Sequence, residues 1–251
     1  MANAEAQNSA SKTPDSGLRK IAINDFLLAV RGLEKSLRNL PHNFGLGFSL
    51  DLKQALESGL PPLYKAYDGY LASQLVTEEK NVTCQKGCSH CCRHYVTSVE
   101  PFEILAIHLR IRQLEHYPDL LFAAHARTSK FEQILKKEGE DAEAEDRALY
   151  RYYLRGAPCP FLEKEGTCGI YEDRPMSCRM FFSESAPRFC QGKQVTSGWN
   201  KNFQVELPDE AEEALARCSE LLAHLDLPVG LFAGVLEANA LLGQYDQPSS
   251  D

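Results

Sequence analysis

The stretch TCQKGCSHCCR, residues 83–93, places four cysteines within nine positions of a 251-residue chain. A thiol is reactive and brings little apolar area, so a packed core gains little from this density. Thiolate is, however, the strong soft ligand for zinc, iron–sulfur clusters and Cu(I). The stretch therefore predicts a metal site around which the rest of the chain is organised.

A second group of cysteines falls in the segment 156–190, where prolines and glycines forbid long regular elements. A loop-rich segment of this length is unusual unless something other than a core holds it. Eight thiols suffice for two tetrahedral sites, or for one cluster and a second metal. We expect an interleaved site to which both groups contribute, and its predicted metal ligands are Cys84, Cys88, Cys91, Cys92, Cys159, Cys168, Cys178 and Cys190.

The sequence leaves open which thiols share one metal. The short gaps between Cys84, Cys88 and Cys91 let a turn bring these three side chains to one centre. Neighbouring side chains tend to point apart, so Cys92 is available for a different metal, for bridging two metals, or for the later group. The ninth cysteine, Cys218, lies in an apolar stripe of helical period and is interpreted as a core residue.

Histidine and carboxylate side chains near the cysteines are less favoured as metal ligands. His90 and His94 flank the first group and are able to coordinate zinc or iron, but eight thiols make them unnecessary. Among carboxylates, Glu103, Glu172 and Asp173 are possible hard ligands or bases, although helix caps and solvated residues are the more common roles.

Thiolates around a divalent ion leave a net negative charge that buried surroundings must offset. Basic residues beside the cysteines are candidates to supply hydrogen bonds to sulfur, although exposed loop positions explain each of them equally well. They are Lys86, Arg93, Arg174, Arg179 and Arg188.

Composition and charge argue against a membrane protein and against a nucleic-acid-binding protein. With 43% hydrophobic residues and no apolar run of spanning length, the chain predicts a globular protein outside the membrane. Its 27 basic and 35 acidic residues give a net charge of −8, which argues against a broad nucleic-acid interface. The first residues lack the basic and apolar regions of a signal peptide. We expect a cytoplasmic protein, whose reduced thiols favour metal over disulfides.

The fold prediction is mainly α, a helical bundle around a loop-rich, cysteine-ligated metal core. Apolar residues at three- and four-residue steps predict a helix over about residues 19–40, and a short helix over 50–57 ends before Gly59 and the Pro61-Pro62 pair. The expected division is a disordered tail (1–17), N-terminal helices (18–80), a cysteine-cluster domain (81–192), C-terminal helices (193–246) and a tail (247–251).

Four blocks occur in order: Cys84-x3-Cys88-x2-Cys91-Cys92, Pro101-Phe102-Glu103, Cys159-Pro160-Phe161-Leu162, and the run from Cys168-Gly169-Ile170 to Cys178-Arg179. This arrangement, over about residues 80–190, resembles the YkgJ-type cysteine-cluster family, a bacterial family described as zinc- or iron-chelating. The resemblance implies a metal role for the first seven cysteines of the ligand set above, and less directly for Cys190.

Three functions remain open at this point. The first is a metal-chelating protein whose helices present a surface to a protein partner or that stores the ion. The second is an enzyme that modifies a protein or peptide side chain, because flagellin lysine N-methylases carry a related cluster with an implied iron–sulfur centre. The chain lacks the G-x-G-x-x-G loop that usually binds S-adenosylmethionine.

The third is a radical S-adenosylmethionine enzyme, since the spacing of Cys84, Cys88 and Cys91 is one that such enzymes use. Against it, the chain shows no repeated strand–helix units, and its additional thiols leave no iron obviously unligated. The sequence does not decide whether the protein is an enzyme, and it predicts no oligomeric state.

Overall fold

The structure is a computed structural model that describes residues 15–40, 48–85, 87–192 and 201–243. The predicted tails lie outside these residues, apart from 15–17, which form the start of a helix instead. The described residues are mainly helical, with one two-stranded sheet, so the predicted fold class is confirmed. They contain no barrel of alternating strands and helices.

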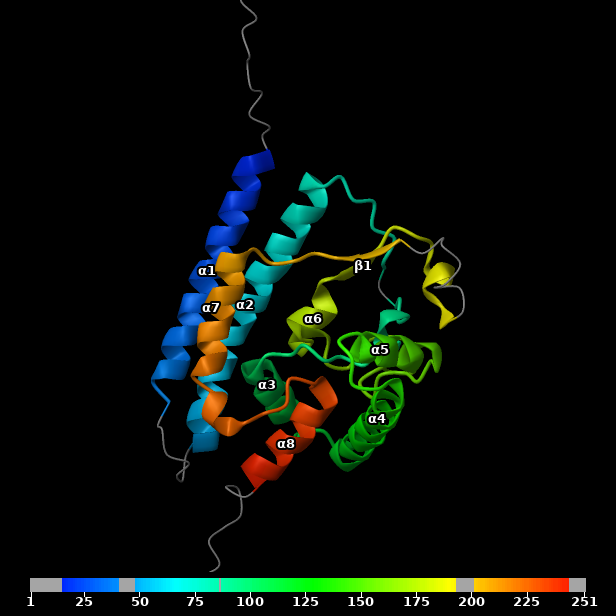
Figure 1. The fold of residues 1–251 in the computed structure, drawn as a ribbon. Coiled ribbons are helices and arrows are strands. Elements are labelled where there is room, and N and C mark those ends of the chain that lie inside the picture. Colours follow the sequence, from blue (N-terminus) through cyan, green and yellow to red (C-terminus); the bar gives the residue numbers. More distant parts are fainter. Residues whose placement is uncertain (1–14, 41–47, 86, 193–200, 244–251) are drawn as a thin grey trace, which may run out of the picture.

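Two long helices, α1 (Asp15–Arg38) and α2 (Phe48–Thr77), and the shorter α7 (Asp209–Glu220) lie side by side and form one layer of the molecule (Figure 1). Helix α1 begins four residues before the predicted start and includes Gly17. A glycine costs a helix only about 1 kcal/mol relative to alanine, which is too little to prevent this extension. The buried residues of α1, Phe26, Val30, Leu33 and Leu37, follow the predicted three- and four-residue steps. The ninth cysteine, Cys218, is fully buried between α7 and α1, as predicted.

Helix α2 corrects the prediction of a break at Pro61-Pro62, because it runs without interruption through both prolines. Both rings lie on its exposed side, where the carbonyls that lose a helical partner can reach water. On its other side, Leu56, Leu60 and Leu63 continue one buried stripe across the prolines. Packing of this stripe offsets the poor helix propensity of proline. The sequence-based prediction considered only that propensity and therefore ended the helix too early.

A second group of helices packs below and beside the first: α3 (Pro101–Ile111), α4 (Tyr117–Glu138), α5 (Ala144–Leu154) and α8 (Leu231–Gly243) (Figure 1). Tyr95 lies at their centre, with its ring stacked on Phe131 at 4.1 Å between centroids and 5.7 Å from the ring of Phe232. This aromatic centre fixes the end of the cysteine stretch against α4 and α8.

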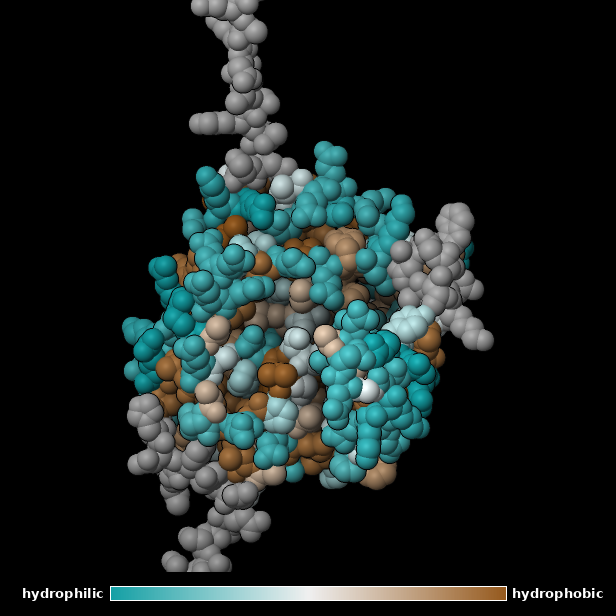
Figure 2. All heavy atoms as spheres, viewed as in Figure 1, coloured by the Kyte–Doolittle hydropathy of each residue, from teal (hydrophilic) through white to brown (hydrophobic). Residues whose placement is uncertain are grey.

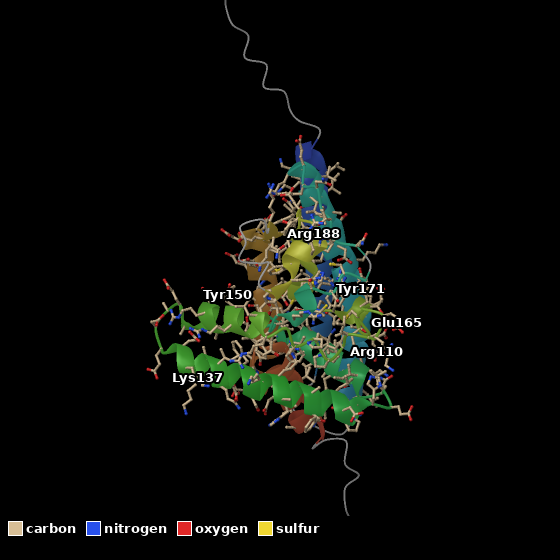
Figure 3. The ribbon with its side chains drawn as sticks, turned by 90° about the vertical axis from the view of Figure 1, so that its right-hand side faces the viewer. Arg110, Lys137, Tyr150, Glu165, Tyr171 and Arg188 are labelled. Atoms are coloured by element: carbon tan, nitrogen blue, oxygen red, sulfur yellow. The ribbon has the colours of Figure 1, made fainter. Side chains whose placement is uncertain are left out.

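Short elements connect the longer helices, and most of them lie in or next to the two cysteine segments. They are η1 (Cys91–Arg93), η2 (Tyr171–Asp173), α6 (Met176–Arg179), β1 (Phe181–Ser183), η3 (Pro187–Cys190), β2 (Asn202–Gln204) and η5 (Ala223–Leu225). Strands β1 and β2 pair antiparallel, with Phe182 opposite Phe203. This small sheet was not predicted. In the view of Figure 3, exposed Arg188 lies near the centre of the face shown, with Tyr150 and Lys137 towards the left and Tyr171 and Glu165 towards the right.

The face shown in Figure 2 is largely hydrophilic, with apolar residues scattered in smaller areas. No helix in the described part of the chain combines the length and the apolar character needed to cross a bilayer.

Two glycines of α2 provide a matched test of the helix layer. A Cβ on Gly59 would lie 2.7 Å from Leu33 Cδ1 and 3.2 Å from Leu33 Cα, whereas one on exposed Gly69 would meet nothing within 4 Å. Gly59→Ala should therefore lower the free energy of unfolding by about 1–3 kcal/mol. Gly69→Ala should raise it by about 0.5–1 kcal/mol through helix propensity alone. Chemical denaturation measures both, and changes of the same sign would contradict the close approach of α1 and α2.

Candidate metal centre

The first cysteine group sits on a loop that is anchored to strand β1. The backbone N–H of Thr83 donates to the carbonyl oxygen of Ser183 at 2.8 Å. The loop then reverses at Gly87, whose φ of +84° is a conformation that glycine adopts without strain, and Cys88 N–H donates to Gln85 O at 2.9 Å. This turn brings Cys84 and Cys88 back towards each other before the chain enters η1.

The second cysteine group is held directly against the first. The backbone N–H of Cys159 donates to the carbonyl oxygen of Cys92 at 2.7 Å, across 67 positions of sequence. The following residues form a small hairpin in which Leu162 pairs with Cys168, and a Cβ at Gly166 in its turn would lie 3.2 Å from the carbonyl oxygen of Gly87. The two segments are therefore in backbone contact, as an interleaved site requires.

Three thiols of the second group are mutual neighbours and also neighbours of Cys91. Burial raises the pKa of Cys178 well above its usual range, and charge on Cys159, Cys91 and Cys168 raises it further. Burial likewise raises the pKa of Cys159 to about 11. Thiols gathered in this way cannot all ionise unless a cation compensates them. The chemistry of the donor set thus fits a bound metal, which would replace the protons.

Cys91 also belongs to a second neighbourhood of thiols, with Cys84, Cys88 and Cys190. Burial raises the pKa of Cys84, and nearby Cys88, Cys91 and Cys190 add to the shift. The thiol of Cys190 at the end of η3 is buried, within hydrogen-bond reach of Ser183 Oγ at 3.6 Å. Cys91, which has an exposed surface, has a raised pKa mainly because of a hydrogen bond with the Cys92 side chain.

The eight thiols are close but not converged. Among the described residues, no three side chains of the types His, Cys, Asp and Glu are arranged so that they could hold a metal ion. All nine cysteines are free thiols. Coordination would therefore require changes of cysteine rotamer within a loop region whose backbone already brings the ligands together. The predicted ligand set stays a prediction.

The two histidines take different positions. His94 packs its ring on Tyr153 at 4.3 Å and near Phe181 at 5.3 Å, and burial lowers its pKa to about 4. His90 lies near Gln191, and burial and then Arg93 lower its pKa. Both are neutral at physiological pH, which is the form that binds a metal, but His94 has the features of a packing residue.

The carboxylates near the cysteines have structural partners. Glu103 is 1% exposed; its Oε1 accepts from Met176 N at 2.8 Å and its Oε2 from Glu100 N at 3.3 Å. It therefore ties the start of α3 to α6, where Cys178 lies. Asp173 faces Arg110 at 3.6 Å, and Glu172 is exposed.

Arginine side chains link the loops to their surroundings. Arg93 donates from Nη1 to Gly156 O at 3.0 Å, and Arg174 lies over Tyr171 at 4.2 Å from the ring centroid. Arg188 lies over Phe189 at 4.9 Å. Lys86 is outside the described residues.

Sequence reasoning missed Arg127 of α4, whose guanidinium donates to backbone carbonyls on both cysteine segments. Its position, more than 30 residues from either group, gave no local signal.

Residues 83–200 match a family model named CxxCxxCC and described as "Putative zinc- or iron-chelating domain". The match covers a little under half of the 251-residue chain, and confirms over that segment the resemblance seen in the sequence. The name of the model puts two residues between its first cysteines, where this chain has three. No curated protein and no solved structure matches the chain.

Glu103 provides a pH test of the tie between α3 and α6. Burial raises its folded-state pKa from 4.5 to about 7, so between these pH values the folded protein binds more protons than the unfolded chain. The free energy of unfolding should therefore fall as pH rises from about 4.5 to 7, by up to about 3 kcal/mol, and then level off.

Glu103→Gln should remove this contribution, even though it also weakens the bond from Glu100 N. Denaturant unfolding of both proteins at several pH values, after identical purification, gives the comparison. Parallel pH profiles for wild type and variant would show that Glu103 does not titrate in this range.

Proposed function

We propose that residues 83–200 chelate zinc or iron through eight thiolates in two adjacent tetrahedral centres. The three thiols Cys84, Cys88 and Cys190 form one set, and Cys159, Cys168 and Cys178 form the other. Cys91 neighbours thiols of both sets, and its thiol is hydrogen-bonded to that of Cys92. Cys91 and Cys92 are assigned as the fourth ligands, one for each centre, which requires their side chains to rotate apart when metal binds. Tetrahedral Cys₄ coordination is typical of structural zinc and is also found for iron.

The observation that supports this proposal is the meeting of two distant cysteine segments through the bond from Cys159 N to Cys92 O. A single set of four ligands would leave half of these gathered thiols unused. Because the loops between 156 and 190 have little regular structure, bound metal would supply much of the free energy that holds them, on the order of 10 kcal/mol for structural zinc.

We further propose that the native role is chelation in a cytoplasmic bacterial protein, with the helical surfaces available to a protein partner. The family description names zinc and iron together, and thiolate ligands suit both metals. Zinc would give a colourless protein, while iron would give the charge-transfer colour of thiolate–iron chemistry.

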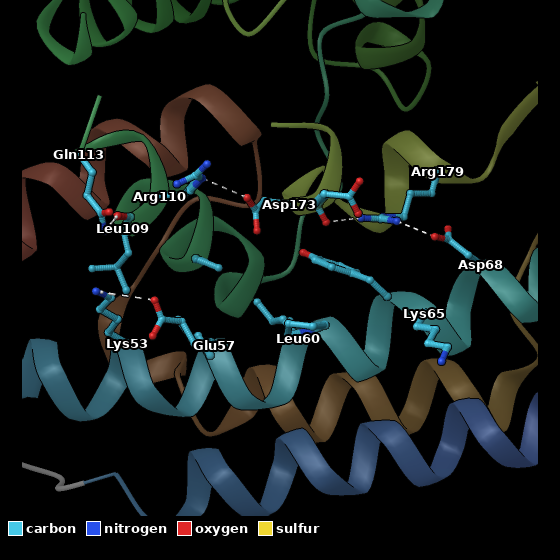
Figure 4. A pocket seen from close by; sticks show the side chains of 15 residues that line it. Lys53, Glu57, Leu60, Lys65, Asp68, Leu109, Arg110, Gln113, Asp173 and Arg179 are labelled. Carbon is cyan, nitrogen blue, oxygen red and sulfur yellow. Dashed lines mark hydrogen bonds and ion pairs between the residues drawn. The ribbon is translucent and has the colours of Figure 1, made fainter. Parts of the chain in front are cut away.

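A second candidate is an iron-dependent or iron–sulfur enzyme that modifies a protein or peptide side chain. It is favoured by a cavity of about 540 Å³ between α2, α3 and α6 (Figure 4). Its wall includes Arg179, the residue after Cys178, and its rim carries side chains of both charges, among them Lys53, Glu57 and Asp173. A space of this size would admit an amino-acid side chain, although no cysteine lines it.

Metal stoichiometry tests the two-centre arrangement. Protein purified without oxygen and analysed for zinc, iron and acid-labile sulfide should contain two metal ions per chain. Cys159→Ser and Cys84→Ser should each reduce the content to about one ion, because each removes a ligand from one centre only. Cys159→Ser should also make the 156–190 region more sensitive to protease.

Cys218→Ala is the matched control, since Cys218 is a free thiol buried in the helix layer, and it should keep the full metal content. Loss of all metal in either serine variant would indicate one shared cluster, and unchanged content would exclude that cysteine as a ligand. Stoichiometric acid-labile sulfide would favour the second candidate, whereas a zinc protein without sulfide would argue against it.

A further inference from the structure

We infer that Arg127 is the buried counter-charge of the thiolate centre and the residue that positions Cys92 and Cys159 within it. The inference rests on the proposed function and assigns a role to a residue far from the cysteines in sequence. It is carried by the burial of Arg127, by its hydrogen bonds, and by the finding that no carboxylate within the described ranges neutralises it.

Arg127 lies on α4 with only 6% of its surface exposed. Its guanidinium lies over two aromatic rings, 5.1 Å from the centroid of Tyr152 and 4.7 Å from that of Phe232. Such contacts favour a desolvated cation. The side chain is therefore held rigidly in the interior, where its charge acts at short range.

The donors of Arg127 reach both cysteine segments. Nη2 donates to His94 O at 3.1 Å, just after the first group, while Nη1 donates to Ala157 O at 2.9 Å and also to Pro158 O, just before Cys159. One planar group thus holds the chain that leaves Cys92 and the chain that enters Cys159. This geometry orients the two residues whose backbones are already hydrogen-bonded to each other.

In the described part of the chain, no carboxylate pairs with Arg127. Four groups near Arg127 would stabilise its positive charge if they were ionised. They are the phenols of Tyr95 and Tyr152 and the thiols of Cys92 and Cys159. Burial raises the pKa of both phenols, which keeps them neutral. The sulfurs are therefore the groups that would carry the compensating negative charge when a metal binds.

Arg179 shows the contrasting case within the same molecule. It too is buried, lies over a tyrosine ring, and donates to two backbone carbonyls, of Arg174 and Glu172. However, its Nη1 lies 2.8 Å from the carboxylate of Asp68, which neutralises it. Of these two similar arginines, Arg127 is the one without a carboxylate partner among the described residues, and the thiols of Cys92 and Cys159 lie near its charge. A buried cation without an anion is costly, and a thiolate centre removes that cost.

The test combines three variants with two measurements. Arg127→Met removes the charge and keeps an apolar stem, and Arg127→Lys keeps the charge without the planar fork. Gly59→Ala, which crowds Leu33 in the helix layer, is the control for a general loss of stability. Zinc affinity is measured by competition with a chromogenic chelator, and thermal unfolding is followed with zinc and after its removal by a chelator. Circular dichroism verifies that each variant is folded.

Arg127→Met should weaken zinc binding by roughly 10- to 100-fold, the usual effect of losing a group that supports metal ligands, and it should reduce the rise in melting temperature that zinc produces. Arg127→Lys should recover a large part of the affinity. Gly59→Ala should lower the melting temperature of both forms alike and leave that rise intact.

Wild-type affinity in Arg127→Met would overturn the inference, and so would equal weakening in Arg127→Lys and Arg127→Met, because charge would then be irrelevant. If Arg127→Met does not fold, the lysine variant decides: retained affinity supports the counter-charge, and a loss as large as 100-fold rejects it. If wild-type protein binds neither zinc nor iron, the proposed function fails, and the inference fails with it.

Discussion

The structure depends on one contact between two parts of the chain that are far apart in sequence, the hydrogen bond from Cys159 N to Cys92 O at 2.7 Å. Side-chain contacts alone would leave the position of each loop adjustable, whereas a backbone bond fixes the two segments relative to each other. Arg127 reinforces this contact from the interior, since it binds carbonyl oxygens on both segments. The cysteines are thus brought together by the polypeptide itself, before any ligand is considered.

The helices act mainly as a frame for this contact. Helices α4 and α5 hold the entry to Cys159, α3 holds α6 through Glu103, and the small sheet holds the start of the first loop through Thr83. Of the eight gathered cysteines, only Cys178 lies on an α-helix, the short α6. A site built from loops on a rigid frame can change ligand geometry without unpacking the core, which suits thiols that must rotate to coordinate a metal.

Sequence reasoning predicted the parts of this fold that depend on periodicity or on composition. Apolar residues at helical spacing, such as Phe26, Val30 and Leu33, located α1, and the density of cysteines located the candidate site. It failed at Pro61-Pro62, since a sequence does not show that both rings face water, and at the three-residue strands, which are too short for alternation. Sequence reasoning missed Arg127 because its hydrogen bonds to both cysteine segments form only when α4 packs against them.

The reactivity of the Cys218 thiol should differ from that of the other eight, because it lies apart from them. It is fully shielded between α7 and α1, where its sulfur lies 3.8 Å from Val30 O. A thiol-specific reagent can reach it only when these two helices part. The rate at which Cys218 is labelled therefore measures how often the helix layer opens. Mass spectrometry of the labelled peptides separates this rate from the labelling of the loop cysteines.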